Sequence, residues 1–111
     1  MNVYDKAYEL TKALQETEEA QELKAALTAA RNDPEAKRMM EDFRDKQTVL
    51  QQKMMEGEQP SQEEMEMMNK LYEVVTLNPL LNRTFDAERR FSIIFDDVTK
   101  IVTESLKTIM E

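Results

Sequence analysis

The chain has 111 residues, of which 34% are charged and 41% hydrophobic, and it carries a net charge of −8 with neither cysteine nor histidine. The absence of cysteine excludes disulfides, thiolate nucleophiles and cysteine-ligated metals, and the absence of histidine excludes a Ser-His triad. Direct nucleic-acid binding is not expected, because phosphate recognition needs clustered cations and no basic stripe is present.

Residues that favour helix dominate the composition, and there are only one glycine and three prolines. The sequence therefore predicts an all-α protein, and its length predicts a single domain over residues 1–111. The amino terminus lacks a basic region followed by an apolar run, and the longest apolar stretches are too short to span a bilayer. We expect a cytoplasmic protein without membrane contact.

Apolar residues recurring with the helical period predict a first helix over 2–16 and a second over 18–31. Thr17 is placed to cap the second helix, whose first turn is acidic. Because no glycine or proline separates the two segments, one bent helix is the alternative. The apolar stripe of the first helix consists of Val3, Ala7, Leu10 and Leu14.

A long helix is predicted over 34–56, roughly 35 Å in length. Asp33 is a favourable N-cap, and Pro34 occupies the first helical position, where its missing N–H has no consequence. Gly57 follows as the expected left-handed residue that ends the helix.

Two further helices are predicted, over 62–77 and 79–109. Ser61 and Glu64 have the capping-box spacing, and Asn78-Pro79 repeats the cap-plus-proline pattern. The first of these helices is expected to bury Met65, Met68, Leu71, Tyr72 and Val75. The last helix has a wide apolar face, which indicates packing against two neighbours. This face consists of Leu80, Ala87, Phe91, Ile94, Phe95, Val98, Ile101, Val102, Leu106 and Ile109. These five helices predict an elongated antiparallel bundle with a long helical hairpin.

Three Met-Met doublets lie in the predicted hairpin, and each places one residue on the core face and one partly outside it. The methionines either fill gaps in the core or form a second apolar surface for self-association or partner docking, to which flexible thioethers are suited. The length of the hairpin favours the second interpretation. The candidate interface residues are Met39, Met40, Phe43, Leu50, Met54, Met55, Met67 and Met68. For Phe43, Leu50 and Met54, a place in the core of a single copy is an equal alternative.

Carboxylates are the only plausible catalytic groups. Glu41 and Asp45 lie four residues apart on one helical face, as do Glu18 and Glu22, but the surrounding lysines and arginines favour solvated ion-pair faces. An all-carboxylate Mg²⁺ or Ca²⁺ site is the alternative, although no calcium-loop motif is present. We therefore expect no enzyme, and neither a catalytic residue, a cofactor nor a metal site.

The segment AKRMMEDFRDKQTVLQQKMMEGEQPSQEEM (36–65) resembles the central signature of the YlbF/YmcA family of small helical bacterial proteins, and within it the uncharacterised YheA-like branch. The amino-terminal YDKAYELTKALQETEE and the later AERRFSIIFDDVTKIV are similar as well. The resemblance implies an oligomeric cytosolic helical protein without catalytic residues. Some relatives hold iron–sulfur clusters through cysteines, a role that this cysteine-free chain does not share.

The sequence thus predicts a non-catalytic protein–protein interaction module that forms a homo-oligomer, a dimer or higher, and that can also bind other proteins. The resemblance supplies one alternative. Relatives form a complex that influences competence, sporulation and biofilm development, partly by modulating a membrane-associated endoribonuclease. By analogy, the chain would be an accessory subunit of an RNA-processing complex.

Overall fold

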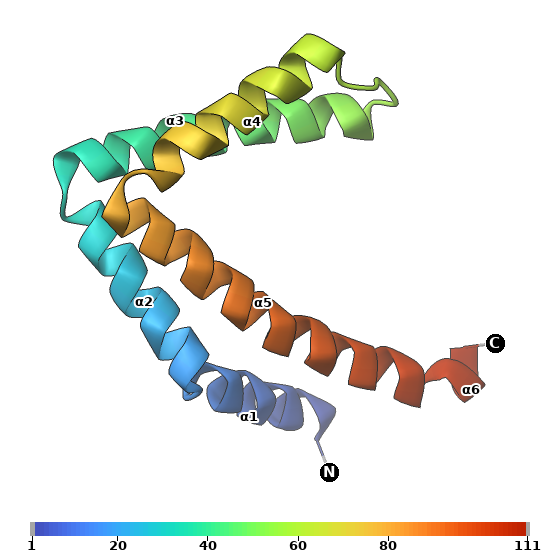
Figure 1. The fold of residues 1–111 in the computed structure, drawn as a ribbon. Helices are drawn as coiled ribbons and strands as arrows, with labels where there is room; N and C mark the ends of the chain where they lie inside the picture. Colours follow the sequence, from blue (N-terminus) through green and yellow to red (C-terminus); the bar gives the residue numbers. More distant parts are fainter. Residues whose placement is uncertain (1, 111) are drawn as a thin grey trace. The chain divides into compact units, whose positions relative to one another are not determined.

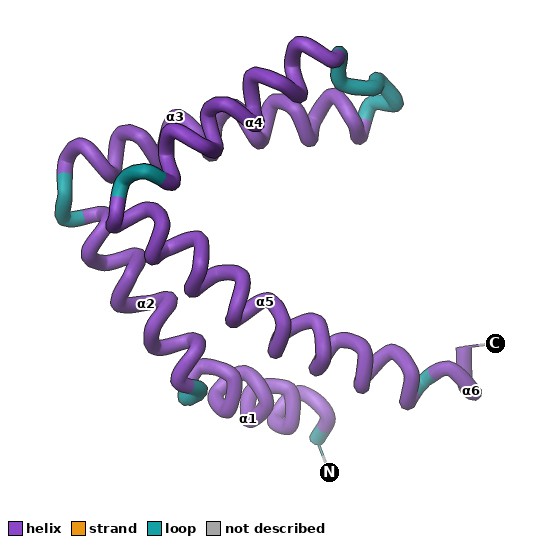
Figure 2. Tube along the Cα trace, viewed as in Figure 1, coloured by secondary structure: helices purple, strands orange, loops and turns teal. Residues whose placement is uncertain are grey.

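The computed structural model describes residues 2–110, and all regular structure in that part of the chain is helical (Figures 1 and 2). The all-α prediction is confirmed. The helices are α1 (Val3–Gln15), α2 (Glu18–Arg31), α3 (Pro34–Met55), α4 (Gln62–Thr76), α5 (Pro79–Ser105) and α6 (Lys107–Met110).

The predicted caps begin these helices. The Asp33 carboxylate accepts a hydrogen bond from the Ala36 amide at 2.9 Å, with Pro34 in the first turn of α3. Ser61 and Glu64 form the reciprocal capping box at the start of α4. These bonds satisfy amides that the helical ladder leaves without partners, so that the helices start where the sequence predicts.

Residues 2–31 form two helices, so the bent-helix alternative is excluded. The Thr17 hydroxyl donates to the carbonyl oxygen of Leu14 at 2.8 Å and accepts from the Ala20 amide at 3.1 Å. One side chain therefore ends α1 and begins α2, although no glycine or proline marks the break.

The prediction of one helix over 79–109 is wrong at its carboxyl end. The Leu106 amide is shared between the carbonyl oxygens of Val102 (3.2 Å) and Thr103 (3.3 Å), and α5 ends at Ser105. The Leu106 carbonyl then accepts from the amides of Ile109 and Met110, which starts the short α6. Local hydrogen bonding causes this break, and no proline or glycine signals it in the sequence.

Contacts divide the chain into two compact units. The hairpin unit comprises residues 26–85, and the terminal unit comprises residues 1–25 and 86–111, of which the structure describes 2–25 and 86–110. The single domain over 1–111 stays a prediction.

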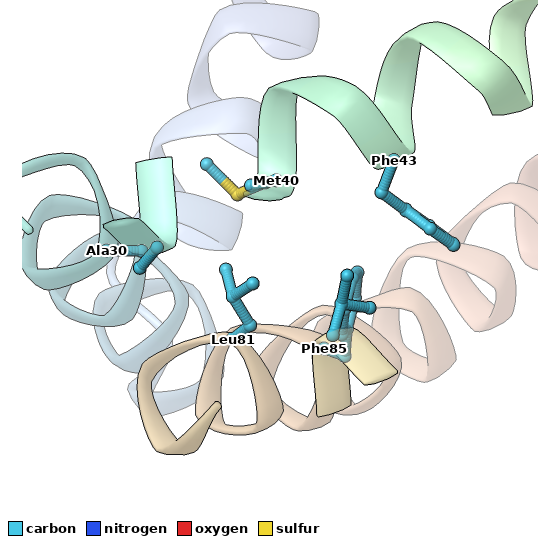
Figure 3. Packing of buried hydrophobic residues seen from close by; sticks show 7 residues of the cluster. Ala30, Met40, Phe43, Leu81 and Phe85 are labelled. Carbon is cyan, nitrogen blue, oxygen red and sulfur yellow. The ribbon is translucent and has the colours of Figure 1, made fainter. Parts of the chain in front are cut away.

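The core of the hairpin unit forms where the end of α2 and the start of α5 meet α3 and α4. Figure 3 shows Leu81 and Phe85 of α5 pointing toward Met40 and Phe43 of α3. The ring centroids of Phe43 and Phe85 lie 5.5 Å apart in an edge-on arrangement, which favours the ring quadrupoles. The buried cluster consists of Ala30, Ala36, Met40, Phe43, Val75, Leu81 and Phe85.

Thr84 is the one fully buried polar residue among those described. Its hydroxyl group donates to the carbonyl oxygens of Leu80 (2.9 Å) and Ala26 (3.3 Å), so that its polar atom is satisfied and links α5 to α2 within the hairpin unit.

Several predicted buried faces are exposed instead. In α4, Met65 is 53% and Tyr72 41% exposed. In the terminal unit, Phe95 is 52% and Ile101 64% exposed, and Ala87 is the only buried residue among those described. The periodicity predicted which residues share a face, but it did not show that a single copy leaves much of that face uncovered.

Replacing Leu81, which is fully buried, with alanine is expected to lower the free energy of unfolding by about 2–5 kcal/mol, because the side chain leaves a cavity in the core. Leu77→Ala is the matched control, since that leucine is 81% exposed, and it should change the value by less than about 0.5 kcal/mol. Urea denaturation followed by circular dichroism measures both. Equal effects would contradict the assigned core.

Candidate interaction groove on the α3–α4 hairpin

Helices α3 and α4 pack against each other as an antiparallel hairpin (Figure 1). The connection begins with Gly57 at a φ of 85°, the left-handed conformation predicted for it. The Gly57 amide donates to the Met54 carbonyl at 3.1 Å and the Glu58 amide donates to the Lys53 carbonyl at 3.0 Å. This is a Schellman motif, which satisfies the last carbonyl groups of α3 and reverses the chain.

An apolar groove of about 580 Å³ runs along one side of this hairpin. It lies between the core and the turn, where no third helix of the hairpin unit packs against α3 and α4. Its apolar lining comes from both helices and consists of Val49, Leu50, Met67, Met68, Leu71 and Val74. Four charged residues also line it, namely Asp45, Lys46, Glu64 and Lys70.

The groove suits apolar side chains better than a polar ligand. Val49, Met67 and Val74 are each more than half exposed, at 55%, 66% and 53%. A small-molecule site usually combines an apolar wall with a few converging polar groups. Here six of the ten lining residues are apolar, and they offer thioether, valine and leucine surfaces.

An ion pair joins the two helices near the turn. Lys53 Nζ donates to Glu64 Oε2 at 2.8 Å, across the two helices. This hydrogen bond, together with the attraction between the charges, raises the pKa of Lys53. The same hydrogen bond, assisted by the Ser61 amide, lowers the pKa of the Glu64 carboxyl group. Glu64 thus serves both the capping box of α4 and the contact with α3.

The predicted interface residues separate into three groups. Leu50, Met67 and Met68 line the groove, and Met68 is also partly buried against the core. Met54 and Met55 lie near the turn and are 58% and 87% exposed.

The remaining three predicted residues belong to the core and are not part of the proposed interface. Met40 and Phe43 are buried, and Met39 is partly buried against the same cluster, with its sulfur atom 3.9 Å from the Asn78 amide nitrogen. By helical periodicity, Met40 lies at the edge of the stripe that Ala36, Met39 and Phe43 form. The start of α5 covers that edge, which the α3 sequence alone does not reveal.

Sequence reasoning missed Val49 and Val74 as parts of the groove. By its helical position Val49 lies off the α3 stripe that contains Leu50, and Val74 is not among the predicted interface residues. A signal did exist, because Met67, Leu71 and Val74 follow one another at spacings of four and three residues. This second stripe on α4 becomes meaningful only when the register of α3 against α4 is known.

A metal site and a membrane span each require a particular arrangement within the described part of the chain. Within residues 2–110, no group of three or more acidic side chains is placed to hold a metal ion. No helix of that part has both the length and the apolar character needed to cross a membrane. The fold and the groove define a small all-helical protein with an exposed apolar surface.

Comparison with known proteins identifies the family. The family model described as "Control of competence regulator ComK, YlbF/YmcA" matches residues 3–107. A UPF0342 protein of Alkalihalophilus pseudofirmus is 44% identical over 108 residues, which cover 97% of this chain and 92% of that protein. A UPF0342 protein of Bacillus licheniformis is 38% identical over 107 residues, covering 96% and 92%.

Two solved structures share the fold. A protein of unknown function (DUF964) from Bacillus stearothermophilus has a TM-score of 0.85 and 29% identity, covering 98% of this chain and 96% of that one. The yheA protein from Bacillus subtilis has a TM-score of 0.71 and 28% identity, covering 98% and 99%. The chain therefore belongs to the YlbF/YmcA family and to its YheA-like branch, which confirms the resemblance seen in the sequence.

The Lys53–Glu64 pair should give a pH-dependent difference between the wild type and Glu64→Gln, which keeps an acceptor for the capping box and loses the charge. The pKa of folded Glu64 lies below its ordinary value, so its contribution to stability is present above the ordinary value and is lost as the pH falls through the folded value. The pKa of Lys53 is raised, so its contribution is lost as the pH rises through its folded value.

Thermal unfolding across pH measures this difference. The unfolding temperature of the wild type should exceed that of the variant at neutral pH, and the two temperatures should converge in strong acid and again in strong alkali. Glu73→Gln is the control, since Glu73 is exposed on the same helix and does not contribute to the Lys53 pair. A difference that stays constant from neutral to acid pH would count against the pair.

Proposed function

We propose that this protein is a non-catalytic helical interaction module that self-associates, and that the α3–α4 groove is part of the surface involved. The observation that carries the proposal is the open apolar lining of the groove, at Val49, Met67 and Val74 in particular. Burial of these exposed side chains against a partner would remove apolar surface from water, which is favourable.

The terminal unit supports the same proposal. Eleven of its large hydrophobic residues, on α1 and on the second half of α5 and beyond, are between 41% and 79% exposed. At 13 residues, α1 would be marginal as an isolated helix, and the burial of Ala87 alone among the described residues of this unit offsets little of the entropy lost on ordering it. A second copy offers an equivalent apolar face, and symmetric homo-oligomers are the commonest assemblies of soluble proteins.

The absence of histidine and cysteine from the sequence supports a non-catalytic role, because it removes the commonest general bases and the thiolate nucleophile. The family description names control of a regulator and no reaction. Methionine in the groove suits adaptable contacts with another protein, since its side chain is flexible and polarizable.

Self-association is tested by light scattering at micromolar concentration, with Met67→Glu as the variant. The wild type should have the mass of two or more chains. The variant should self-associate at least about tenfold more weakly, because a charge must be desolvated in the groove. Its helicity should be retained. Met65→Glu is the matched control, since Met65 lies on the same helix, is 53% exposed and does not line the groove. A wild type that stays monomeric throughout would overturn the proposal.

A second candidate function is that of a regulatory accessory subunit, as the family description favours. This role is tested by immobilising the wild type and Met67→Glu, incubating each with lysate of the source cells, and comparing the proteins that they retain. A protein retained by the wild type and lost from the variant would support a regulatory partner at the groove. Retention of no protein other than the chain itself would contradict this second role.

A further inference from the structure

We propose that the groove is filled by the same hairpin of a second copy, related by a two-fold axis near Met67 that sets the two α4 helices antiparallel. This inference rests on the proposed self-association and specifies its geometry. It follows from the placement of charge and apolar surface along α4.

The exposed stripe of α4 carries a repeating pattern. Glu63, Met67, Lys70 and Val74 lie at successive spacings of four, three and four residues, which place them on one face of a helix. The last three of them line the groove. An acidic residue therefore precedes the apolar centre on the side of the turn, and a basic residue follows it on the side of the core.

The whole hairpin has the same charge polarity. Residues 48–68, around the turn, contain five glutamates and one lysine, and that lysine is Lys53, already paired with Glu64. The rest of the hairpin, 34–47 and 69–76, contains five acidic and five basic residues. Two hairpins packed in parallel would bring their acidic ends together, whereas antiparallel packing places each acidic end beside the end that holds the cations.

The spacing makes this face complementary to itself. Seven residues separate Glu63 from Lys70, about 10 Å along the helix axis, and Met67 lies next to the midpoint. A two-fold axis at that midpoint brings Glu63 of one copy against Lys70 of the other, and the symmetry repeats the pair. Within residues 2–110 neither side chain has an ion-pair partner, so both are available.

A charge exchange tests the pairing. Glu63→Lys should weaken self-association about tenfold, because it places two lysines together at both symmetric positions, and Lys70→Glu should do the same with two glutamates. An equimolar mixture of the two variants should form mixed dimers with wild-type affinity, since both contacts are then attractive. The double variant Glu63→Lys/Lys70→Glu should self-associate again without a second variant, because each lysine then faces a glutamate. Sedimentation velocity at low salt measures all four.

Two matched variants control for net charge. Glu73→Lys and Lys37→Glu change the charge of the hairpin by the same amounts, and neither residue lines the groove. They should leave the affinity within about twofold of the wild type. Circular dichroism establishes that each variant keeps its helices, as expected for exposed positions.

A cysteine probe tests the antiparallel arrangement, because the chain contains no cysteine of its own. Met67→Cys, next to the axis, should form a disulfide-linked dimer under mild oxidation. Val74→Cys should not, since antiparallel packing separates its two copies by about 20 Å along the axis. Parallel packing would bring both positions together and cross-link both variants.

The outcomes separate this inference from the proposed function. A monomeric wild type overturns both. A wild type that self-associates, with Glu63→Lys and Lys70→Glu unaffected or not restored by mixing, overturns the paired geometry and leaves self-association standing. Efficient cross-linking through Val74→Cys overturns the antiparallel arrangement. Rescue in the mixture, with cross-linking through Met67→Cys alone, supports the inference.

Discussion

The packing of Phe43, Val75, Leu81 and Phe85 at one end of the α3–α4 hairpin is the interaction on which the hairpin unit depends. Segments from four helices enclose these side chains and hold α3 and α4 in register. Farther toward the turn, only two helices remain within the unit, and two helices share a single seam that cannot enclose apolar residues on every side. The apolar groove is the consequence of this geometry.

The helix boundaries of the hairpin could be predicted because their causes are local. Asp33, Ser61 and Gly57 act through hydrogen bonds and backbone angles within a few residues, and the sequence shows them directly. The break at Leu106 was missed because a shared amide has no characteristic residue. At Thr17 the sequence predicted the cap of α2. It did not decide whether α1 ends there, because no glycine or proline follows α1.

The candidate site was less predictable because burial depends on contacts between distant segments. Met40 and Met67 have the same side chain and lie in similar doublets, yet one is 8% and the other 66% exposed. Their difference arises from α5, which begins 39 residues after Met40 and covers it. Periodicity assigned each methionine to a face but did not decide which face another helix would cover. The same limit hid Val49 and Val74 until α3 and α4 were in register.

The turn that joins α3 to α4 has a stereochemical consequence. A methyl group added to Gly57 would meet no heavy atom within 4 Å, so the space around the turn imposes no constraint. The positive φ imposes one, because that backbone conformation is unfavourable for L-residues and natural for their mirror images. The turn therefore constrains the sign of φ rather than the size of the side chain, so that L-alanine is strained at this position although its methyl group has room.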